Sequence, residues 1–291
     1  MVKLSQALEN VQEAKLGAGC SLQTVDRYAY AVGKLQDRLG DVPLEAVAAR
    51  DVRALLAAMR RGGLSLHTLE TVHRTLNAFW NFCAAEYHVQ SPMGAVERPR
   101  TPKNLPPYLT TEQVAALFQA VEKTHNKAKN RAILAFLLDT GVRSGELRTL
   151  RRDHVDLTKR RAQVVGKGRK ERIVPFSPPT RAALMLYWEG RSDAWPWAFH
   201  SQQAADGQYT ASGVRSLLRR LAEYAGLEVR VYPHLCRHTF ACRWVQAGGD
   251  VETLRRILGH SSIAVTLKYL GLVVDDLQAK HDELKPLGGV T

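Results

Sequence analysis

The chain has 291 residues, 45% of them hydrophobic, so it can bury one large core or two ordinary ones and is not expected to be disordered. Its 41 lysines and arginines against 28 aspartates and glutamates give a net charge of +13, which favours a polyanion such as nucleic acid as partner. It has no signal-peptide pattern and no run of ~20 uncharged apolar residues, so we expect a cytoplasmic protein without a membrane span.

The apolar residues of the N-terminal part recur at three- and four-residue steps over 22–39 and again over 69–87. This spacing predicts two helices. Ser21 and Ser65 stand where the N-caps of these helices are expected. We therefore predict an N-terminal bundle of about four helices.

The stretch 98–107 carries four prolines and three basic residues, which stop a helix and exclude a central strand. We predict an N-terminal domain at 1–98, a linker at 99–107 and a second domain at 108–291. Divided after residue 104, the two parts have net charges of +3 and +10. The second part therefore carries most of the attraction for a polyanion.

Beyond the linker, the pattern predicts helices interrupted by one hairpin. A helix over 110–121 begins with a capping box, and an apolar helix over 130–139 stops at Gly141. Two β-prone runs within 161–176 flank a Gly-Lys-Gly turn, which is typical of an antiparallel hairpin. Further helices are expected near 178–190, 211–225, 234–247, 250–258, 262–270 and 274–285. The predicted fold class is mainly α, with a mostly helical second domain that contains one small antiparallel sheet.

Four cysteines, Cys20, Cys83, Cys236 and Cys242, stand at irregular spacing without a CxxC pair. This pattern indicates neither a disulfide framework nor a zinc site, and it fits a reducing compartment best. We therefore expect Cys236 and Cys242 to be packing residues, and we expect no metal and no cofactor.

Two segments of the second domain place basic residues at helix starts. In TGVRSGEL, Arg143 follows one helix and begins the next. In VYPHLCRH, Pro233 starts a helix that puts His234 and Arg237 on one face of its first turn. A helix N-terminus attracts anions, and a guanidinium matches two phosphate oxygens, so this pattern predicts a phosphate site. The apolar surroundings of His238 favour a hydrogen-bonded core histidine.

Three further residues have ordinary explanations when each is taken alone. Lys167 in the GKGRKER turn fits a surface lysine on a DNA backbone, His260 in LGH fits a helix end, and Tyr269 fits the edge of a core. Their order along one basic chain, together with Arg143 and the HLCRH motif, indicates a common site.

These motifs resemble those of the tyrosine recombinase (phage integrase) family, most closely the Xer-type site-specific recombinases. Residues 1–98 resemble the family's SAM-like core-binding domain, and 108–285 resemble its catalytic domain. Leu270-Gly271 follow the tyrosine where Xer proteins tend to have Thr-His. The family's catalytic positions fall on Arg143, Lys167, His234, Arg237, His260 and Tyr269.

The resemblance implies a site-specific DNA recombinase that acts through a 3′-phosphotyrosyl intermediate and a Holliday junction. Its task would be chromosome dimer resolution or the integration and excision of a mobile element. The implied partner is double-stranded DNA, with a homotetramer on two DNA sites or a heterotetramer with a related recombinase. A terminal helix such as 274–285 would dock on a neighbouring protomer.

The chemical types of these residues suit the charge changes that occur during phosphoryl transfer. Arg143 and Arg237 can neutralise the charge that builds on the phosphate oxygens without a metal. Tyr269, with an ordinary pKa of about 10, needs a base, for which His234 is the candidate. Lys167 can protonate the leaving 5′-oxygen.

Two alternatives stay open at this point. A type IB topoisomerase-like nicking and closing enzyme uses a similar residue set and would relax plasmids that lack a specific site. A non-catalytic DNA-binding protein on the same scaffold is disfavoured by the complete residue set. A Mg²⁺-dependent nuclease fits less well, because no carboxylate cluster suits a two-metal site.

Overall fold

The computed structural model describes residues 1–101, 107–166, 170–202 and 204–269. The chain divides into two compact units, Met1–Lys103 and Asn104–Thr291. Within the described ranges, no helix combines the length and the hydropathy that a bilayer crossing requires.

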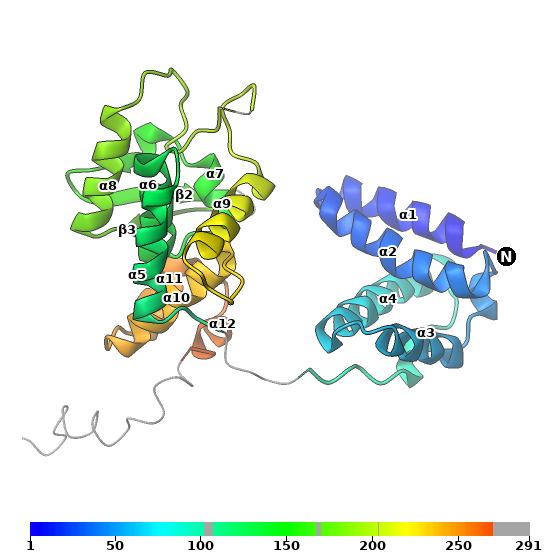
Figure 1. The fold of residues 1–291 in the computed structure, drawn as a ribbon. Helices are drawn as coiled ribbons and strands as arrows, with labels where there is room; N and C mark the ends of the chain where they lie inside the picture. Colours follow the sequence, from blue (N-terminus) through cyan, green and yellow to red (C-terminus); the bar gives the residue numbers. More distant parts are fainter. Residues whose placement is uncertain (102–106, 167–169, 203, 270–291) are drawn as a thin grey trace, which may run out of the picture. The chain divides into compact units, whose positions relative to one another are not determined.

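The first unit is a bundle of four helices, drawn from blue to cyan in Figure 1. Its elements are α1 (Leu4–Gly17), α2 (Leu22–Leu39), η1 (Leu44–Ala46), α3 (Ala49–Arg61), α4 (Leu66–Tyr87) and η2 (Pro92–Ala95). The two helices predicted over 22–39 and 69–87 are confirmed. Ser65 caps α4, because its hydroxyl accepts a hydrogen bond from the backbone N–H of Thr68.

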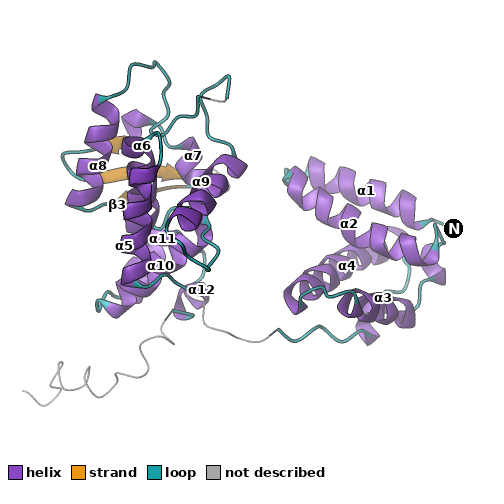
Figure 2. Cartoon of the chain, in the orientation of Figure 1, coloured by secondary structure: helices purple, strands orange, loops and turns teal. Residues whose placement is uncertain are grey.

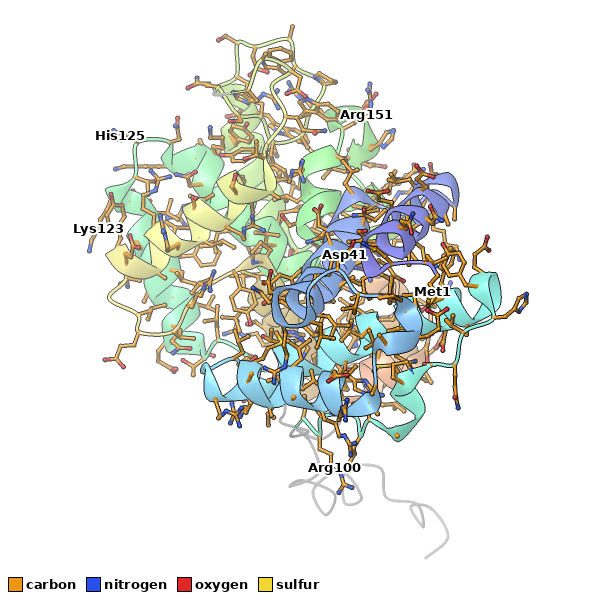
Figure 3. All side chains as sticks on the ribbon, turned by 90° about the vertical axis from the view of Figure 1, so that its right-hand side faces the viewer. Met1, Asp41, Arg100, Lys123, His125 and Arg151 are labelled. Atoms are coloured by element: carbon orange, nitrogen blue, oxygen red, sulfur yellow. The ribbon has the colours of Figure 1, made fainter. Side chains whose placement is uncertain are left out.

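The core of this bundle forms where α4 packs against α1, α2 and α3. Phe79 and Trp80 of α4 are fully buried and meet edge to face, with ring centroids 5.6 Å apart. The start of α1 is fixed by Asp41, whose carboxylate accepts hydrogen bonds from the backbone N–H and the hydroxyl of Ser5; Figure 3 shows Asp41 and Met1 on this unit.

The second unit is mostly helical and contains one three-stranded antiparallel sheet (Figure 2). Its helices are α5 (Thr111–Ala120), η3 (Val121–Lys123), α6 (Lys127–Thr140), α7 (Ser144–Thr149), η4 (Arg152–His154), α8 (Pro178–Glu189), α9 (Ala211–Tyr224), α10 (Pro233–Gln246), α11 (Val251–Leu258) and α12 (Ile263–Leu267). Its strands are β1 (Val155–Asp156), β2 (Arg161–Val165) and β3 (Glu171–Pro175).

The predicted hairpin is confirmed as β2 and β3, in a register that pairs Ala162 with Val174 and Val164 with Arg172. The two-residue strand β1 was not predicted, because an element this short carries no periodic pattern. The hairpin tip at 167–169 and the predicted helix at 274–285 lie outside the described residues.

Helix α6 is the central element of the second unit and packs against α8 and α10. Its Phe136 is fully buried, with its ring centroid 6.1 Å from that of Phe176 and 5.6 Å from that of Phe199. Strand β2 contacts α7 and strand β3 contacts α11. The sheet therefore joins α7 to α11, and the candidate site lies beside these two helices.

Gly141 ends α6 in the left-handed region, with φ of +61°, and turns the chain into α7. A Cβ at this position would lie 2.6 Å from Cδ1 of Phe240 and 2.9 Å from Cδ2 of Leu258. A side chain would therefore be strained in its backbone and would also collide with its neighbours.

We predict that Gly141→Ala lowers the free energy of unfolding of the second unit by at least about 2 kcal/mol, from the left-handed conformation and the collision together. The control is Gly145→Ala in α7, where a Cβ meets nothing within 4 Å and the change should be neutral or stabilising. Urea unfolding, monitored by hydrogen exchange in α6, measures the free energy of unfolding of both variants. Equal stabilities would contradict the prediction.

Candidate active site

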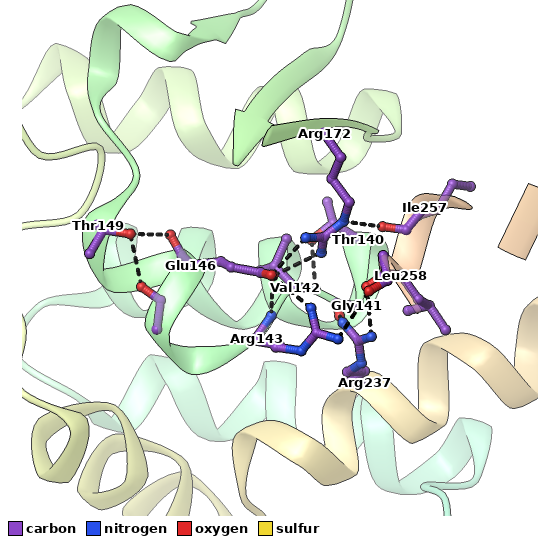
Figure 4. A network of polar contacts seen from close by, with 12 residues as sticks. Thr140, Gly141, Val142, Arg143, Glu146, Thr149, Arg172, Arg237, Ile257 and Leu258 are labelled. Carbon is purple, nitrogen blue, oxygen red and sulfur yellow. Dashed lines mark hydrogen bonds and ion pairs between the residues drawn. The ribbon is translucent and has the colours of Figure 1, made fainter. Parts of the chain in front are cut away.

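The candidate site forms where the end of α6, the start of α7, strand β3, the start of α10 and the end of α11 meet (Figure 4). All five predicted site residues within the described part of the chain lie here or on the adjoining segment: Arg143, His234, Arg237, His260 and Tyr269. Lys167 lies outside the described residues.

Arg143 occupies the N-cap of α7, as predicted, and forms a capping box with Glu146. Its backbone N–H donates to Oε2 of Glu146 at 2.8 Å, and its Nη1 donates to Oε1 at 2.9 Å. Its Nη2 donates to the carbonyl of Gly259 at 3.3 Å. The side chain stays 37% exposed, so the guanidinium is fixed on one side and open on the other.

Arg237 lies in the first turn of α10 and is only 3% exposed. Its Nη1 donates to the carbonyl of Gly141 at 2.8 Å, and its Nη2 donates to the carbonyl of Leu258 at 2.7 Å. Burial and the nearby charge of Arg143 lower the pKa of the guanidinium to about 9, so it remains charged at pH 7. A charged group that is shielded from water attracts a phosphate more strongly than one in solvent.

Arg143, Arg237, Glu146 and Arg172 together form what we call the arginine network (Figure 4). The sequence analysis missed Glu146 and Arg172. The Glu146 carboxylate is 2% exposed and accepts two hydrogen bonds from Arg172, at 2.6 Å from Nη1 and 2.8 Å from Nη2. Arg172 also donates from Nε to the carbonyl of Ile257 at 2.6 Å. The spacing of Arg143 and Glu146 was a usable signal for a capping box, whereas nothing in the basic run GKGRKER distinguishes Arg172.

Two histidines of the set lie in the field of these arginines. Desolvation by the surrounding protein and the charges of Arg237 and Arg143 lower the pKa of His234, although its side chain at the start of α10 stays open to solvent. The same causes lower the pKa of the half-buried His260 to about 4. The Nδ1 of His260 lies 2.8 Å from the hydroxyl of Thr266. Both imidazoles are therefore neutral at pH 7 and can accept a proton or a hydrogen bond.

Tyr269 is 3% exposed, and its hydroxyl lies 2.7 Å from Nδ1 of His238. Burial raises the pKa of Tyr269, while the charge of Arg237 acts in the opposite direction. His238 is hydrogen-bonded, as predicted, but it is only partly buried and is not a core residue, and its partner is the candidate nucleophile. In this structure the tyrosine hydroxyl therefore pairs with His238 and not with His234.

An open pocket of about 830 Å³ adjoins the network. Its lining is dominated by basic side chains and includes Arg143, Lys170, Arg172, Arg255, Arg256 and His260. Gly166, which directly precedes Lys167, also lines it. A pocket of this charge fits a phosphate backbone.

The cysteines stand apart from this chemistry. Cys236 and Cys242 of α10 are fully buried in apolar clusters, which confirms them as packing residues. Burial raises the pKa of each thiol to about 12. They are therefore protonated and unreactive at neutral pH.

We predict that Glu146→Gln lowers the free energy of unfolding of the second unit by about 3 kcal/mol, because two guanidinium groups lose a buried counter-charge. Burial alone would raise the pKa of Glu146, but hydrogen bonds from Arg172 and Arg143 hold it below 4.5. The carboxylate therefore stabilises the fold above pH 4.5, and this contribution is lost as the pH falls through its lower folded pKa.

Unfolding in urea at pH 7 and at decreasing pH measures this contribution. Glu252→Gln is the control, because Glu252 forms an exposed ion pair with Arg255 and its loss should leave stability nearly unchanged. Equal losses for the two variants at pH 7 would mean that the Glu146 carboxylate is not the structural counter-ion.

Comparison with known proteins gives one family. Residues 107–273 match the phage integrase family. A tyrosine recombinase XerC of Oceanobacillus iheyensis is 32% identical over 245 residues, which cover 81% of this chain and 80% of that protein. A tyrosine recombinase XerA of Thermococcus kodakarensis is 30% identical over 271 residues, covering 92% of this chain and 91% of that protein.

Solved structures share the fold. The Tn1549 transposon integrase in complex with transposon right end DNA has a TM-score of 0.79 and 23% identity, covering 98% of this chain and 100% of that chain. The XerH site-specific recombinase bound to palindromic difH substrate has a TM-score of 0.74 and 21% identity, covering 97% of this chain and 84% of that chain. The predicted mainly α fold with a small antiparallel sheet is confirmed.

Proposed function

Because this chain belongs to the phage integrase family of tyrosine recombinases, we propose that it is a site-specific recombinase that breaks and rejoins DNA strands at its arginine network. The observation that carries the proposal is the meeting of Arg143 and Arg237 beside two neutral histidines, with Tyr269 within reach of the Arg237 charge. Family membership favours recombination over the topoisomerase-like alternative.

Arg143 and Arg237 bind the phosphate to be attacked. Tyrosine attack builds negative charge on the non-bridging oxygens of a five-coordinate phosphorus, and the two guanidinium groups neutralise it. Backbone carbonyls hold Arg237 in place before DNA arrives, so little reorganisation is needed. His260 donates a further hydrogen bond from the ring nitrogen that does not face Thr266.

The proton transfers fall to His234 and Lys167. The phenolic oxygen of Tyr269 forms a bond to phosphorus while the bond from phosphorus to the 5′-oxygen breaks. His234, neutral at pH 7, accepts the phenolic proton, and Lys167 donates a proton to the leaving oxygen. The resulting 3′-phosphotyrosyl link retains the phosphodiester's energy, so a second 5′-hydroxyl can reverse the step and join a new strand.

The wider assembly follows the family. We propose that residues 1–98 form a core-binding domain that contacts double-stranded DNA, and that the linker at 99–107 joins it to the catalytic domain at 108–291. Four protomers act on two DNA sites through a Holliday junction in the cytoplasm. They form either a homotetramer of this chain or a heterotetramer with a related recombinase. The net charge of +13 and the DNA complexes among the similar structures support DNA as the partner.

The test is a covalent trapping experiment. Nicked suicide duplexes from a random pool are incubated with the full chain, and covalently bound DNA is sequenced. We predict that Tyr269→Phe lowers adduct formation by at least about 1,000-fold with DNA binding retained, because the nucleophilic oxygen is missing. Tyr224→Phe, which changes an exposed tyrosine of α9, is the control and should leave the adduct unchanged. A persistent adduct in Tyr269→Phe would place the nucleophile elsewhere.

A second prediction concerns Lys167. Lys167→Ala should slow cleavage of the trapped sequence by about 100-fold or more, because the 5′-oxygen must then leave without a proton. A 5′-bridging phosphorothiolate should restore the rate, since sulfur leaves without protonation. The matched control is Lys170→Ala, which removes a charge from the pocket lining and should respond equally to both substrates. If the sulfur substrate restores nothing in Lys167→Ala, the lysine is not the general acid.

A further inference from the structure

Side-chain contacts hold the chain on both sides of the predicted linker at 99–107. On the N-terminal side, Arg98 donates to the buried carboxylate of Glu70 in α4, with 2.6 Å between Nη2 and Oε1. The same helix holds the carbonyl of Val96, which accepts a hydrogen bond from Nε2 of the buried His73 at 3.1 Å. The first unit therefore fixes the chain up to the residue before the linker.

On the C-terminal side, the chain is held by α10, the helix that carries His234 and Arg237. The backbone N–H of Leu109 donates to Oγ1 of Thr239 at 2.9 Å, and both residues are fully buried. Leu109 belongs to the main apolar cluster of the second unit. Because water cannot replace the hydroxyl at a buried site, this bond fixes the chain where it enters the second unit.

Two further contacts come from the same face of α10. Nη2 of Arg243 donates to the hydroxyl of Thr111, and Nε2 of Gln246 donates to the hydroxyl of Tyr108, each at 3.2 Å. Thr239 and these two residues of α10 follow one another at steps of four and three, so they form one stripe along the helix. The segment that enters the second unit therefore lies along one face of α10.

Thr239 also contacts the first turn of this helix. Its hydroxyl donates to the carbonyl of Leu235 at 2.8 Å while it accepts from Leu109. A hydroxyl has one proton and two lone pairs, so it can make both bonds at once. Leu235 directly follows His234 and lies two residues before Arg237. One side chain therefore joins the incoming chain to the turn that carries the proposed base and a proposed phosphate-binding arginine.

We infer that Thr239 is a positioning residue that couples the linker to the active site, because it holds the first turn of α10 in place relative to the chain that arrives from the first unit. The inference rests on the proposed function, in which the first unit binds DNA and α10 contributes to cleavage. Since the chain is held on both sides of the linker, a pull on the linker acts on α10 through the contact of Leu109 with Thr239.

A measurement without DNA tests the positioning. The amide resonance of Leu109 and the ring ¹³Cε1 resonance of His234 are followed by NMR in the full chain. We expect Thr239→Val to speed hydrogen exchange of the Leu109 amide by at least about tenfold and to move the His234 resonance, because the hydroxyl is lost while the shape of the side chain is kept. Thr239→Ser keeps the hydroxyl and should restore both signals to their wild-type behaviour.

The matched control is Thr124→Val. Thr124 is also a buried threonine of the second unit, and its hydroxyl donates to the carbonyl of Val121 and accepts from Nδ2 of Asn130. Because these partners lie in η3 and α6, the control should leave the signals of Leu109 and His234 unmoved. An unmoved His234 resonance in a folded Thr239→Val, or the same shift in Thr124→Val, would overturn the inference.

A double-mutant cycle tests the coupling in cleavage. Gly-Ser-Gly is inserted after Arg100, between the two places where the chain is held, and adduct formation with the trapped duplex is measured in single turnovers at saturating protein. We expect the insertion and Thr239→Val each to slow adduct formation by about tenfold. The double variant should be no slower than the slower single variant, because both changes break the same connection.

With Thr124→Val in place of Thr239→Val, the effects of the two changes should multiply, because distant sites act independently. Multiplying effects for the insertion and Thr239→Val would overturn the inference. The NMR comparison needs no DNA, so a wild-type chain that traps no duplex would count against the proposed function alone.

Discussion

The candidate site depends on one buried carboxylate. Glu146 accepts hydrogen bonds from Arg143 and Arg172 (Figure 4), so a single negative charge holds two guanidinium groups that line the pocket. Without it, these groups and Arg237 would leave uncompensated positive charge in a partly dry place. Because one carboxylate cannot neutralise three guanidinium groups, the network keeps a net positive charge that a phosphate can neutralise.

This positive field also sets the state of the residues around it. Arg143 and Arg237 contribute, after burial, to the lowered pKa values of His234 and His260, which leave both imidazoles neutral. The same field opposes the effect of burial on Tyr269. A phosphate bound between the arginines would weaken the field, so substrate binding and the basicity of the histidines are coupled by Coulomb's law.

Local features of the fold were predictable because their causes are local. The helix at 22–39, the hairpin within 161–176 and the place of Arg143 at a helix start follow from periodicity, turn residues and caps. The partnership of Glu146 with Arg172 was not predictable, because it joins a helix to a strand 26 residues away. The contact of Tyr269 with His238 likewise depends on how the segment after α11 packs, which no sequence pattern reports. The roles of the predicted site residues stay predictions.

The acceptors that hold the arginines are mostly backbone atoms at helix ends. Gly141 and Leu258 hold Arg237, Ile257 holds Arg172, and Gly259, with φ of +64°, ends α11 and accepts from Arg143. The negative ends of the α6 and α11 dipoles thus face the cations. Truncating a side chain cannot delete a main-chain oxygen, so an alanine scan would pass over Ile257 and Leu258 as acceptors. Among these four backbone acceptors, only Gly141 and Gly259 depend on residue type through their own backbone conformation, because a positive φ favours glycine.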